Sequence, residues 1–327
     1  MQHRYMGNTG LSVSCLGLGT LTWGRDTTIT EAEAICKAYR DAGGNVIDTS
    51  PSYGDGDAER VVGELINSSI DRSEIVLMTK GGYFCSADTR RLSHSRNAIL
   101  QSIDRSLNRC QTDYIDVFFL QFSDPHTPIE ETLSTLELAL RSGRVRYVGV
   151  SNFSAWNTAE AFYRGANLGV PVQAVQAEYS LLERGIEREL TPALESQGLG
   201  LFAWSALARG VLTGKYRHST PADSRGASPV FAEFVEPHLT PQAQQIVEAV
   251  AKAAEGLDAS ALEVALGWLL QQPAVTCGLV GPRTLTHMRQ MIDALRFELP
   301  APIAQALTEV SQLHRGYPET SAMDDDV

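Results

Sequence analysis

Short apolar segments alternate along the chain with longer segments of helical periodicity. Each short segment is rich in apolar and β-branched residues and ends in turn residues. A stretch follows in which apolar positions recur every three or four residues. No Ser/Gly-rich linker divides the chain, so the alternation predicts parallel strands joined by helices. The expected strands are 15–19, 45–49, 75–80, 115–121, 147–151, 174–178, 199–204 and 275–280.

Three of the helical segments begin with a capping signal. A hydroxyl residue stands three positions before a glutamate at Thr30, Thr127 and Ser260. This spacing lets the two side chains satisfy free amide groups at a helix start. The helix after Thr30 is expected to end at Gly43, and the helix after Thr127 at Gly143. Each helix then presents an apolar stripe that can cover a sheet.

The strand and helix pattern favours one α/β domain, a (β/α)8 TIM barrel over residues 1–315. A barrel needs about 250 residues, and loops take up the remainder of this chain. Residues 5–14 contain Gly7-Asn8-Thr9-Gly10 between two extended runs and predict an N-terminal β-hairpin under the barrel. The segment 205–241 follows the seventh strand and is long enough to form a binding loop. The acidic tail 316–327 is expected to be mobile.

Composition and charge exclude several classes of protein. The apolar fraction of 43% and the charged fraction of 20% are typical of globular chains. The net charge of −12 argues against surfaces that bind nucleic acid or anionic membranes. Without a signal peptide or an apolar membrane span, a cytoplasmic location is expected. The five cysteines lack metal-binding spacing, so we expect reduced structural thiols and no metal site.

Reactive side chains gather at the carboxyl ends of neighbouring expected strands, where barrels of this kind build active sites. Asp48, Lys80 and Gln121 end the second, third and fourth strands, and Tyr53 lies in the loop after the second. An ammonium beside a phenol favours the phenolate, so Lys80 is expected to lower the pKa of Tyr53 from about 10. Tyr53 then suits protonation of a carbonyl oxygen while a nicotinamide supplies hydride. The alternative is a structural ion pair with Tyr53 as packing.

Several motifs in order along nearly the whole chain resemble the aldo-keto reductase superfamily, close to its branch of potassium-channel β subunits and aryl-alcohol dehydrogenases. The motifs are residues 5–11, Asp48-Thr49-Ser50-Pro51-Ser52-Tyr53-Gly54 with Glu59 and Gly63, Thr79-Lys80, 114–116, 143–153 and 281–284. The resemblance implies a barrel that binds NADPH without a Rossmann fold and reduces a small carbonyl compound. It makes Tyr53 the acid, Lys80 the group that modulates its pKa, and Asp48 the residue that orients the lysine.

The same resemblance implies where the cofactor and substrate bind. Ser151, Asn152 and Gln176 are expected to hydrogen-bond the nicotinamide carboxamide. Trp204 is expected to stack on the nicotinamide ring. The cations Lys215 and Arg283 suit phosphates and favour NADPH over NADH. The expected cofactor contacts are Gly19, Thr20, Asp48, Ser151, Asn152, Gln176, Trp204, Ser205, Ala206, Leu207, Lys215, Gly281, Arg283 and His287. The expected substrate contacts are Trp23, Tyr53 and Gln121.

Gln121 stands where the family usually carries a catalytic histidine. A glutamine amide can donate a hydrogen bond but does not change charge near neutral pH. Three functions stay open: carbonyl reduction with Gln121 as a neutral donor, reduction of a C=C bond conjugated to a ketone, and a slow NADPH-binding sensor. His126, farther along the same loop, is expected at solvent or at a helix start. The expected partner is a small carbonyl or enone molecule, with no nucleic acid and no membrane.

Overall fold

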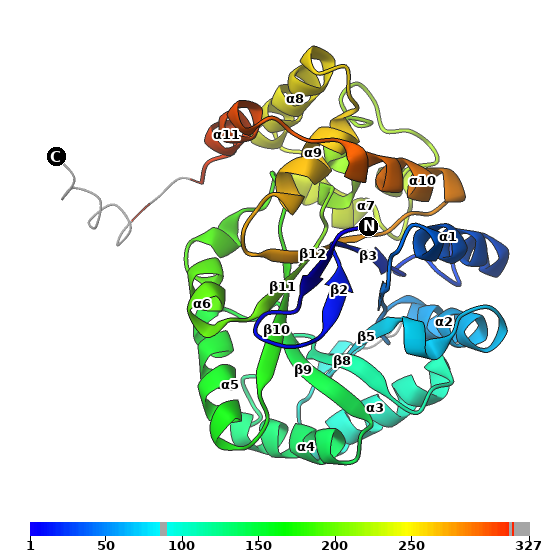
Figure 1. The fold of residues 1–327 in the computed structure, drawn as a ribbon, viewed down its shortest axis with the longest axis vertical. Coiled ribbons are helices and arrows are strands. Elements are labelled where there is room, and N and C mark those ends of the chain that lie inside the picture. The colour runs from blue at the N-terminus through cyan, green and yellow to red at the C-terminus, as the bar shows by residue number, and fades with distance from the viewer. Residues whose placement is uncertain (86–89, 314–315, 317–327) are drawn as a thin grey trace.

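A closed barrel of parallel strands forms the centre of the protein (Figure 1). The computed structural model describes residues 1–85, 90–313 and 316. Each barrel strand pairs with the next barrel strand along the chain, and the last barrel strand pairs with the first. The (β/α)8 prediction is confirmed, with differences only at strand ends. The barrel strands of the described chain are β3 (Leu16–Gly19), β4 (Val46–Asp48), β5 (Val76–Gly81), β8 (Ile115–Leu120), β9 (Val145–Ser151), β10 (Val172–Glu178), β11 (Gly200–Trp204) and β12 (Val275–Val280).

Helices surround the barrel and bury their apolar faces against it (Figure 1). In the helix after β8, for example, Leu133 and Leu136 lie on one buried face, as their spacing predicts. The helices are α1 (Ile29–Asp41), α2 (Asp57–Ser68), α3 (Arg96–Cys110), α4 (Ile129–Arg141), α5 (Ala155–Asn167), α6 (Leu190–Gln197), α7 (Ala232–Val235), α8 (Pro241–Gly256), α9 (Ala261–Leu270), α10 (Leu285–Asp293) and α11 (Ala301–Val310).

The capping signals identify one helix start correctly and misplace another. At α9, the Ser260 hydroxyl accepts from the Glu263 N–H at 3.2 Å, and the Glu263 carboxylate accepts from the Ser260 N–H at 2.7 Å. The predicted cap at Thr30 is wrong. Thr28 caps α1 and accepts from the Glu31 N–H at 3.3 Å. Thr30 already lies inside the first turn, where its hydroxyl is in the wrong place to cap the helix.

The third predicted cap, at Thr127, is also wrong. Pro128 occupies the N-cap position of α4, and its own side chain makes no capping hydrogen bond. The Thr127 hydroxyl donates instead to the Asp124 carboxylate at 2.6 Å. The Glu130 carboxylate forms an ion pair with Arg164. Because both members of the expected box bind other partners, neither is left to satisfy the helix end.

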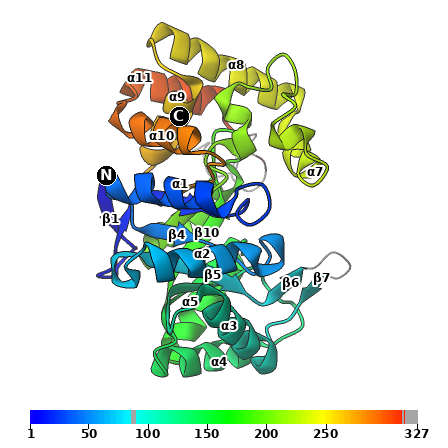
Figure 2. The same ribbon diagram turned by 90° about the vertical axis from the view of Figure 1, so that its right-hand side faces the viewer.

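The predicted N-terminal hairpin covers one end of the barrel. Its strands are β1 (His3–Tyr5) and β2 (Ser12–Ser14), which pair antiparallel. Met6 and Val13 have no exposed surface and pack in the barrel interior with Phe119. In Figure 2 the hairpin lies at the end of the barrel opposite α7. The hairpin prediction is therefore confirmed, and its apolar residues close the barrel core.

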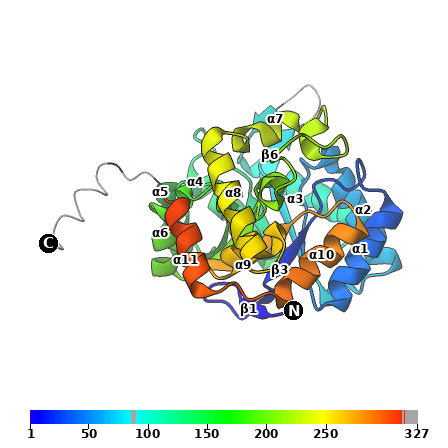
Figure 3. The ribbon, with the colours of Figure 1, turned by 90° about the horizontal axis from the view of Figure 1, so that it is seen from above.

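Two chain segments lie at the end of the barrel opposite this hairpin. Figures 2 and 3 show both segments on the same side of the molecule. The first is a hairpin that the sequence did not predict, between β5 and α3. The second is the long loop after β11, which carries short helical turns and α7. The elements of these segments are β6 (Tyr83–Cys85), β7 (Arg90–Leu92), η4 (Ala208–Thr213), η5 (Arg225–Ala227) and η6 (Glu236–His238).

Some sequence predictions fall at the limits of the described residues. The tail 316–327 lies outside them apart from Gly316. Cys15, Cys36, Cys110 and Cys277 are buried free thiols, while the prediction for Cys85 lies outside the described side chains. Across the described ranges, no helix combines the length and the apolar character that crossing a membrane requires.

Candidate active site

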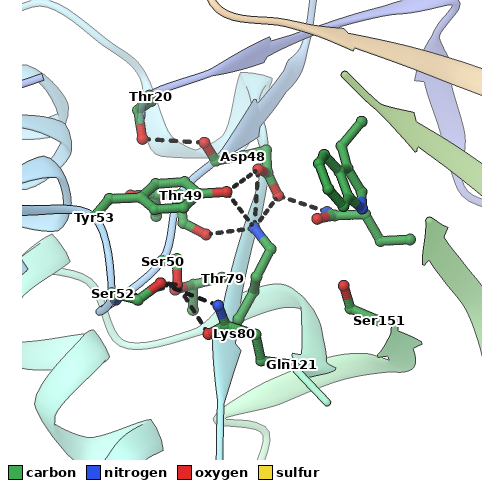
Figure 4. A network of polar contacts seen from close by, with 12 residues as sticks. Thr20, Asp48, Thr49, Ser50, Ser52, Tyr53, Thr79, Lys80, Gln121 and Ser151 are labelled. Atoms are coloured by element: carbon green, nitrogen blue, oxygen red, sulfur yellow. Dashed lines mark hydrogen bonds and ion pairs between the residues drawn. The ribbon is translucent and has the colours of Figure 1, made fainter. Parts of the chain in front are cut away.

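Asp48 and Lys80 form a buried ion pair at the carboxyl ends of β4 and β5 (Figure 4). The Lys80 ammonium lies 2.8 and 2.9 Å from the two carboxylate oxygens and donates to the Thr49 carbonyl oxygen at 3.0 Å. From β10, on the far side of the barrel, the Gln176 amide donates to the same carboxylate at 2.7 Å. The ion pair predicted from strand spacing is present, and Gln176 holds the carboxylate from the other side.

The hydroxyl of Tyr53 completes this group of side chains. Tyr53 lies in the loop after β4, where its N–H donates to the Ser50 carbonyl oxygen at 3.0 Å. Its hydroxyl oxygen lies 3.3 Å from the Lys80 ammonium and 3.5 Å from an Asp48 carboxylate oxygen. The structure therefore brings together the three side chains that the sequence predicts as acid, lysine and aspartate.

The surroundings of Tyr53 raise its pKa, which is the opposite of the direction that the sequence predicted. Burial of the hydroxyl has the largest effect, because it disfavours the charged phenolate. The Lys80 ammonium lowers the pKa, while the Asp48 carboxylate raises it. The sequence prediction considered the ammonium alone. With the raised pKa, Tyr53 is a neutral phenol at neutral pH, which is the protonation state that an acid requires.

Lys80 keeps its charge in this buried position. Burial alone would lower the pKa of its ammonium, but the Asp48 carboxylate and the Tyr53 hydroxyl together raise it above the ordinary value. A fixed positive charge therefore lies beside the phenol oxygen. Such a charge stabilises the phenolate that forms whenever Tyr53 gives up its proton.

A cavity of about 520 Å³ opens beside this group. Its volume lies in the range of small-molecule and cofactor sites. The wall includes Tyr53 and continues along the loops that follow β11 and β12. Of the expected cofactor contacts, those on the wall are Gly19, Asp48, Trp204, Ser205, Ala206, Leu207, Lys215, Gly281, Arg283 and His287.

The other expected cofactor contacts are not among the described residues that line this cavity: Thr20, Ser151, Asn152 and Gln176. Thr20, Ser151 and Gln176 are buried. Thr20 donates to the main-chain oxygen of Asp48 at 3.1 Å. Ser151 accepts from the Asn152 amide at 3.1 Å. These residues therefore surround the site and hold its members, but the described structure does not bring them to the cavity surface.

Asn152 fixes the edge of the Trp204 ring. Its amide oxygen accepts from the Trp204 indole N–H at 3.1 Å, and its main-chain N–H donates to the Gln176 carbonyl oxygen at 3.1 Å. Asn152 has a φ of 56°, a left-handed conformation that asparagine tolerates better than most residues. The aromatic face that Trp204 contributes to the cavity is thus held in one orientation.

Trp23 is not among the described residues that line the cavity, so its expected contact with the substrate is wrong. Its side chain has no exposed surface and belongs to the hydrophobic core. In the turn after β3, the Trp23 N–H donates to the Thr20 carbonyl oxygen at 2.9 Å. This turn carries the indole inward, where its Nε1 has no hydrogen-bond partner among the described residues.

Basic side chains gather on the part of the wall formed by the long loop after β11 and the segment after β12. They are Arg209, which is paired with Glu178, and a group of four others, Lys215, Arg225, Arg283 and His287. Burial lowers the pKa of Lys215, and Arg225 and Arg283 lower it further. The pKa of His287 is also lowered, by burial and by the same three neighbours. Positive groups that repel one another at a cavity wall favour the binding of an anion such as phosphate.

Arg225 was not among the residues predicted from the sequence. Its Nη2 donates to the main-chain oxygen of Gly281 at 2.9 Å, but its Nε is buried with no partner among the described residues. Burial and the nearby Arg283 lower the pKa of its guanidinium to about 10. A buried donor without an acceptor costs roughly 1 to 3 kcal/mol. A bound anion is therefore the natural partner of Arg225.

Gln121 and His126 occupy different surroundings in the loop after β8. The Gln121 carboxamide is hydrogen-bonded to Ser50 and Ser52, and it is not among the described residues that line the cavity. His126 is exposed, and its N–H donates to the Asp124 carboxylate at 2.9 Å. His126 thus lies at solvent, as expected, and does not replace an imidazole at position 121.

Comparisons with known proteins agree with this architecture. Residues 15–312 match the model of the aldo/keto reductase family. The "Uncharacterized oxidoreductase YrpG" of Bacillus subtilis (strain 168) is 34% identical over 322 residues, which cover 95% of this chain and 96% of that protein. A "Probable voltage-gated potassium channel subunit beta" of Oryza sativa subsp. japonica is 34% identical over 301 residues, 90% of each chain. The chain therefore belongs to the aldo/keto reductase family, whose members are oxidoreductases that bind nicotinamide cofactors.

Proposed function

We propose that this chain is an NADPH-dependent reductase of a small carbonyl compound, an aldehyde or a ketone. The observation that carries the proposal is a single cavity whose wall contains both the Tyr53 acid and a group of four basic side chains. The first provides a proton for the carbonyl oxygen, and the second provides a site for phosphate. A reductase that uses a phosphorylated nicotinamide cofactor needs both.

The residues on the wall fit the cofactor. The buried Nε of Arg225 and the buried hydroxyl of Ser205 have no hydrogen-bond partner among the described residues, so both are available to phosphate oxygens. Lys215 and Arg283 add positive charge, which favours the extra phosphate of NADPH over NADH, and His287, whose pKa is lowered, adds a neutral imidazole beside them. Trp204, with its ring edge held by Asn152, offers a flat face for the nicotinamide.

The catalytic step that we propose uses Tyr53 as the acid. When bound, the nicotinamide supplies a hydride to the carbonyl carbon. As negative charge develops on the carbonyl oxygen, the Tyr53 hydroxyl donates its proton to that oxygen. The Lys80 ammonium, at 3.3 Å, stabilises the phenolate that remains, and Asp48 holds the ammonium in place with both carboxylate oxygens.

Two alternative functions rest on the glutamine at position 121. Because position 121 carries no titrating imidazole, turnover of a carbonyl compound would be slow. A regulatory protein that binds the cofactor is therefore the second candidate. The similarity to a protein named as a probable channel subunit favours it. A reducer of a conjugated C=C bond is the third candidate, because an altered group at this position changes how the acceptor oxygen is polarised.

Stopped-flow oxidation of bound NADPH tests the proposal with a matched aldehyde, ketone and enone. We expect reduction of the aldehyde or ketone by the parent, and a loss of at least about a hundredfold in Tyr53→Phe with NADPH binding retained. Tyr163→Phe, at an exposed tyrosine of α5, is the matched control. Equal rates in Tyr53→Phe and the parent contradict the acid role. Preference for the enone supports the third candidate, and tight binding without hydride transfer supports the second.

A further inference from the structure

The Gln121 carboxamide is part of a closed ring of hydrogen bonds with Ser50 and Ser52 (Figure 4). The Ser50 hydroxyl donates to Gln121 Oε1 at 3.3 Å, and Gln121 Nε2 donates to the Ser52 hydroxyl at 3.1 Å. The two serine hydroxyl oxygens are 2.8 Å apart. Because Ser50 gives its only hydrogen to Gln121, Ser52 must donate across this last contact. Each of the three side chains then donates one bond and accepts one.

Burial makes the hydrogen bonds of this ring costly to break. Ser50 has no exposed surface, and Gln121 is only 8% exposed. In water, such bonds would exchange freely with solvent, but a buried polar group left without its partner costs roughly 1 to 3 kcal/mol. Ser52 is only partly buried, but the loss of any one member leaves Ser50 or Gln121 without its partner in a buried position. The carboxamide and the two hydroxyls therefore hold one arrangement.

On one side, the ring is continuous with the turn that carries Tyr53. The Ser52 N–H donates to the Ser50 hydroxyl oxygen at 3.2 Å, and the Tyr53 N–H donates to the Ser50 carbonyl oxygen at 3.0 Å. Ser52 directly precedes Tyr53 in the chain. Gln121, at the end of β8, thus braces the loop after β4 at the residue next to the acid.

On the other side, Gln121 is linked to the aromatic wall of the cavity. The Asn152 amide donates to the main-chain oxygen of Gln121 at 3.0 Å, and its oxygen accepts from the Trp204 indole at 3.1 Å. A polar chain therefore runs along the rim of the barrel from the loop of Tyr53 to Trp204. Its middle member is Gln121.

We infer that Gln121 is a positioning residue, which acts through Ser50 and Ser52 to fix the loop of Tyr53, and that it does not itself contact the carbonyl acceptor. This inference replaces the sequence expectation of direct substrate contact. The kinetic consequences rest on the proposed reductase function. Transfer of a proton requires the acid within about 2.6 to 3.2 Å of its acceptor, and a displacement of about 1 Å can slow such a step a hundredfold.

A double-mutant cycle tests the inference in the full chain. Gln121→Met keeps the length of the side chain and removes the amide, while Ser50→Ala removes the hydroxyl that binds it. We expect each change to lower kcat about tenfold or more with little change in KM, and the double variant to be no slower than Gln121→Met. If Gln121→Met lowers kcat by the same factor in both backgrounds, the two residues act independently and the inference fails.

Two further variants separate positioning from general damage. Ser52→Thr keeps a hydroxyl at the same place and should retain the activity that Ser52→Ala loses. Ser68→Ala changes an exposed serine at the end of α2 and should leave activity unchanged. If Ser52→Ala is as active as Ser52→Thr, the hydroxyl does not brace the loop, and the inference is overturned.

A titration of Tyr53 gives a readout that needs no turnover. Carbon-labelled tyrosine is followed by NMR against pH, with Tyr53→Phe to assign the resonance. We expect Gln121→Met and Ser50→Ala to move the Tyr53 titration by a similar amount toward the ordinary value of about 10, because the loop no longer holds the phenol in its buried place. An unchanged titration in both variants contradicts the brace. If the parent reduces no carbonyl compound, the proposed function fails, and this titration still decides the inference.

Discussion

The Arg225 guanidinium donates to the main-chain oxygen of Gly281 at 2.9 Å and ties the long loop after β11 to the segment that follows β12. The same link brings Arg225 beside Arg283 on the cavity wall. A loop that is distant in sequence thereby contributes a cation to the phosphate end of the proposed cofactor site. The Nε of this guanidinium is buried and has no partner among the described residues.

Arg225→Met should weaken NADPH binding about tenfold or more and NADH binding much less. The reason is that a charge-assisted hydrogen bond to phosphate contributes about 1.5 to 3 kcal/mol, and only NADPH carries the additional phosphate. Fluorescence titration of each cofactor measures the two Kd values. Arg217→Met is the matched control, since Arg217 lies in the same loop but pairs with Glu248 outside the cavity wall. Equal losses for the two cofactors would contradict the assignment of Arg225.

The barrel and part of the site could be predicted because their signals are local in the sequence. Asp48 and Lys80 end apolar runs that become β4 and β5, so the geometry of a parallel barrel alone brings them together. Arg225 had no such signal, because its place depends on the path of a long loop. Burial reversed the predicted pKa direction of Tyr53, and burial cannot be read from the spacing of three residues.

Trp23 and Gln121 show the same limit for side-chain direction. Gln121 ends an expected strand and Trp23 follows one, at positions where a barrel places binding residues. The turn after β3 buries the indole of Trp23, and Ser50 and Ser52 engage the carboxamide of Gln121. Only the packed structure determines which side chains near a strand end reach the cavity.

Lys80→Met should lower both stability and activity. It leaves the Asp48 carboxylate buried without its cation, which costs roughly 3 to 5 kcal/mol of the free energy of unfolding. Urea denaturation measures this loss, and carbonyl reduction should fall about a hundredfold or more. The double variant Asp48→Asn/Lys80→Met removes both charges and should recover much of the stability but none of the activity. Recovery of activity together with stability would mean that the pair is structural only.

The stability of the fold should fall between about pH 6.5 and pH 4 because of His94. Burial lowers the pKa of this imidazole from 6.5 to about 4, although Asp124 and the main chain of Phe122 raise it in part. The unfolded chain therefore binds a proton in this range that the folded chain does not. The stabilisation is complete above the unfolded pKa and is lost as the pH falls to the folded pKa.

Across that range the loss should reach about 3 kcal/mol, at about 1.4 kcal/mol for each pH unit. Urea denaturation at several pH values measures it. His94→Phe keeps a ring in the same buried place without a titrating group. The variant is expected to be less stable at neutral pH, because the main-chain contact of the imidazole is lost, but to show a flatter pH dependence. The same slope in the variant and the parent would assign the effect to other groups.

Gly7→Ala should destabilise the protein without changing its cofactor site. Gly7 has a φ of +52°, and an added Cβ would lie 2.3 Å from the Gly198 carbonyl oxygen and 2.6 Å from the Gly200 nitrogen at the start of β11. Both the left-handed backbone and the close approach to another main chain oppose a side chain, so we expect a loss of at least about 2 kcal/mol. Gly10→Ala, in the same hairpin turn, adds a Cβ that meets no described residue within 4 Å, and this change should be neutral or slightly stabilising. Because the hairpin closes the barrel at the end opposite α7, the Kd for NADPH should be unchanged in both variants. A lower affinity in Gly7→Ala would show that the hairpin influences the site through the barrel core.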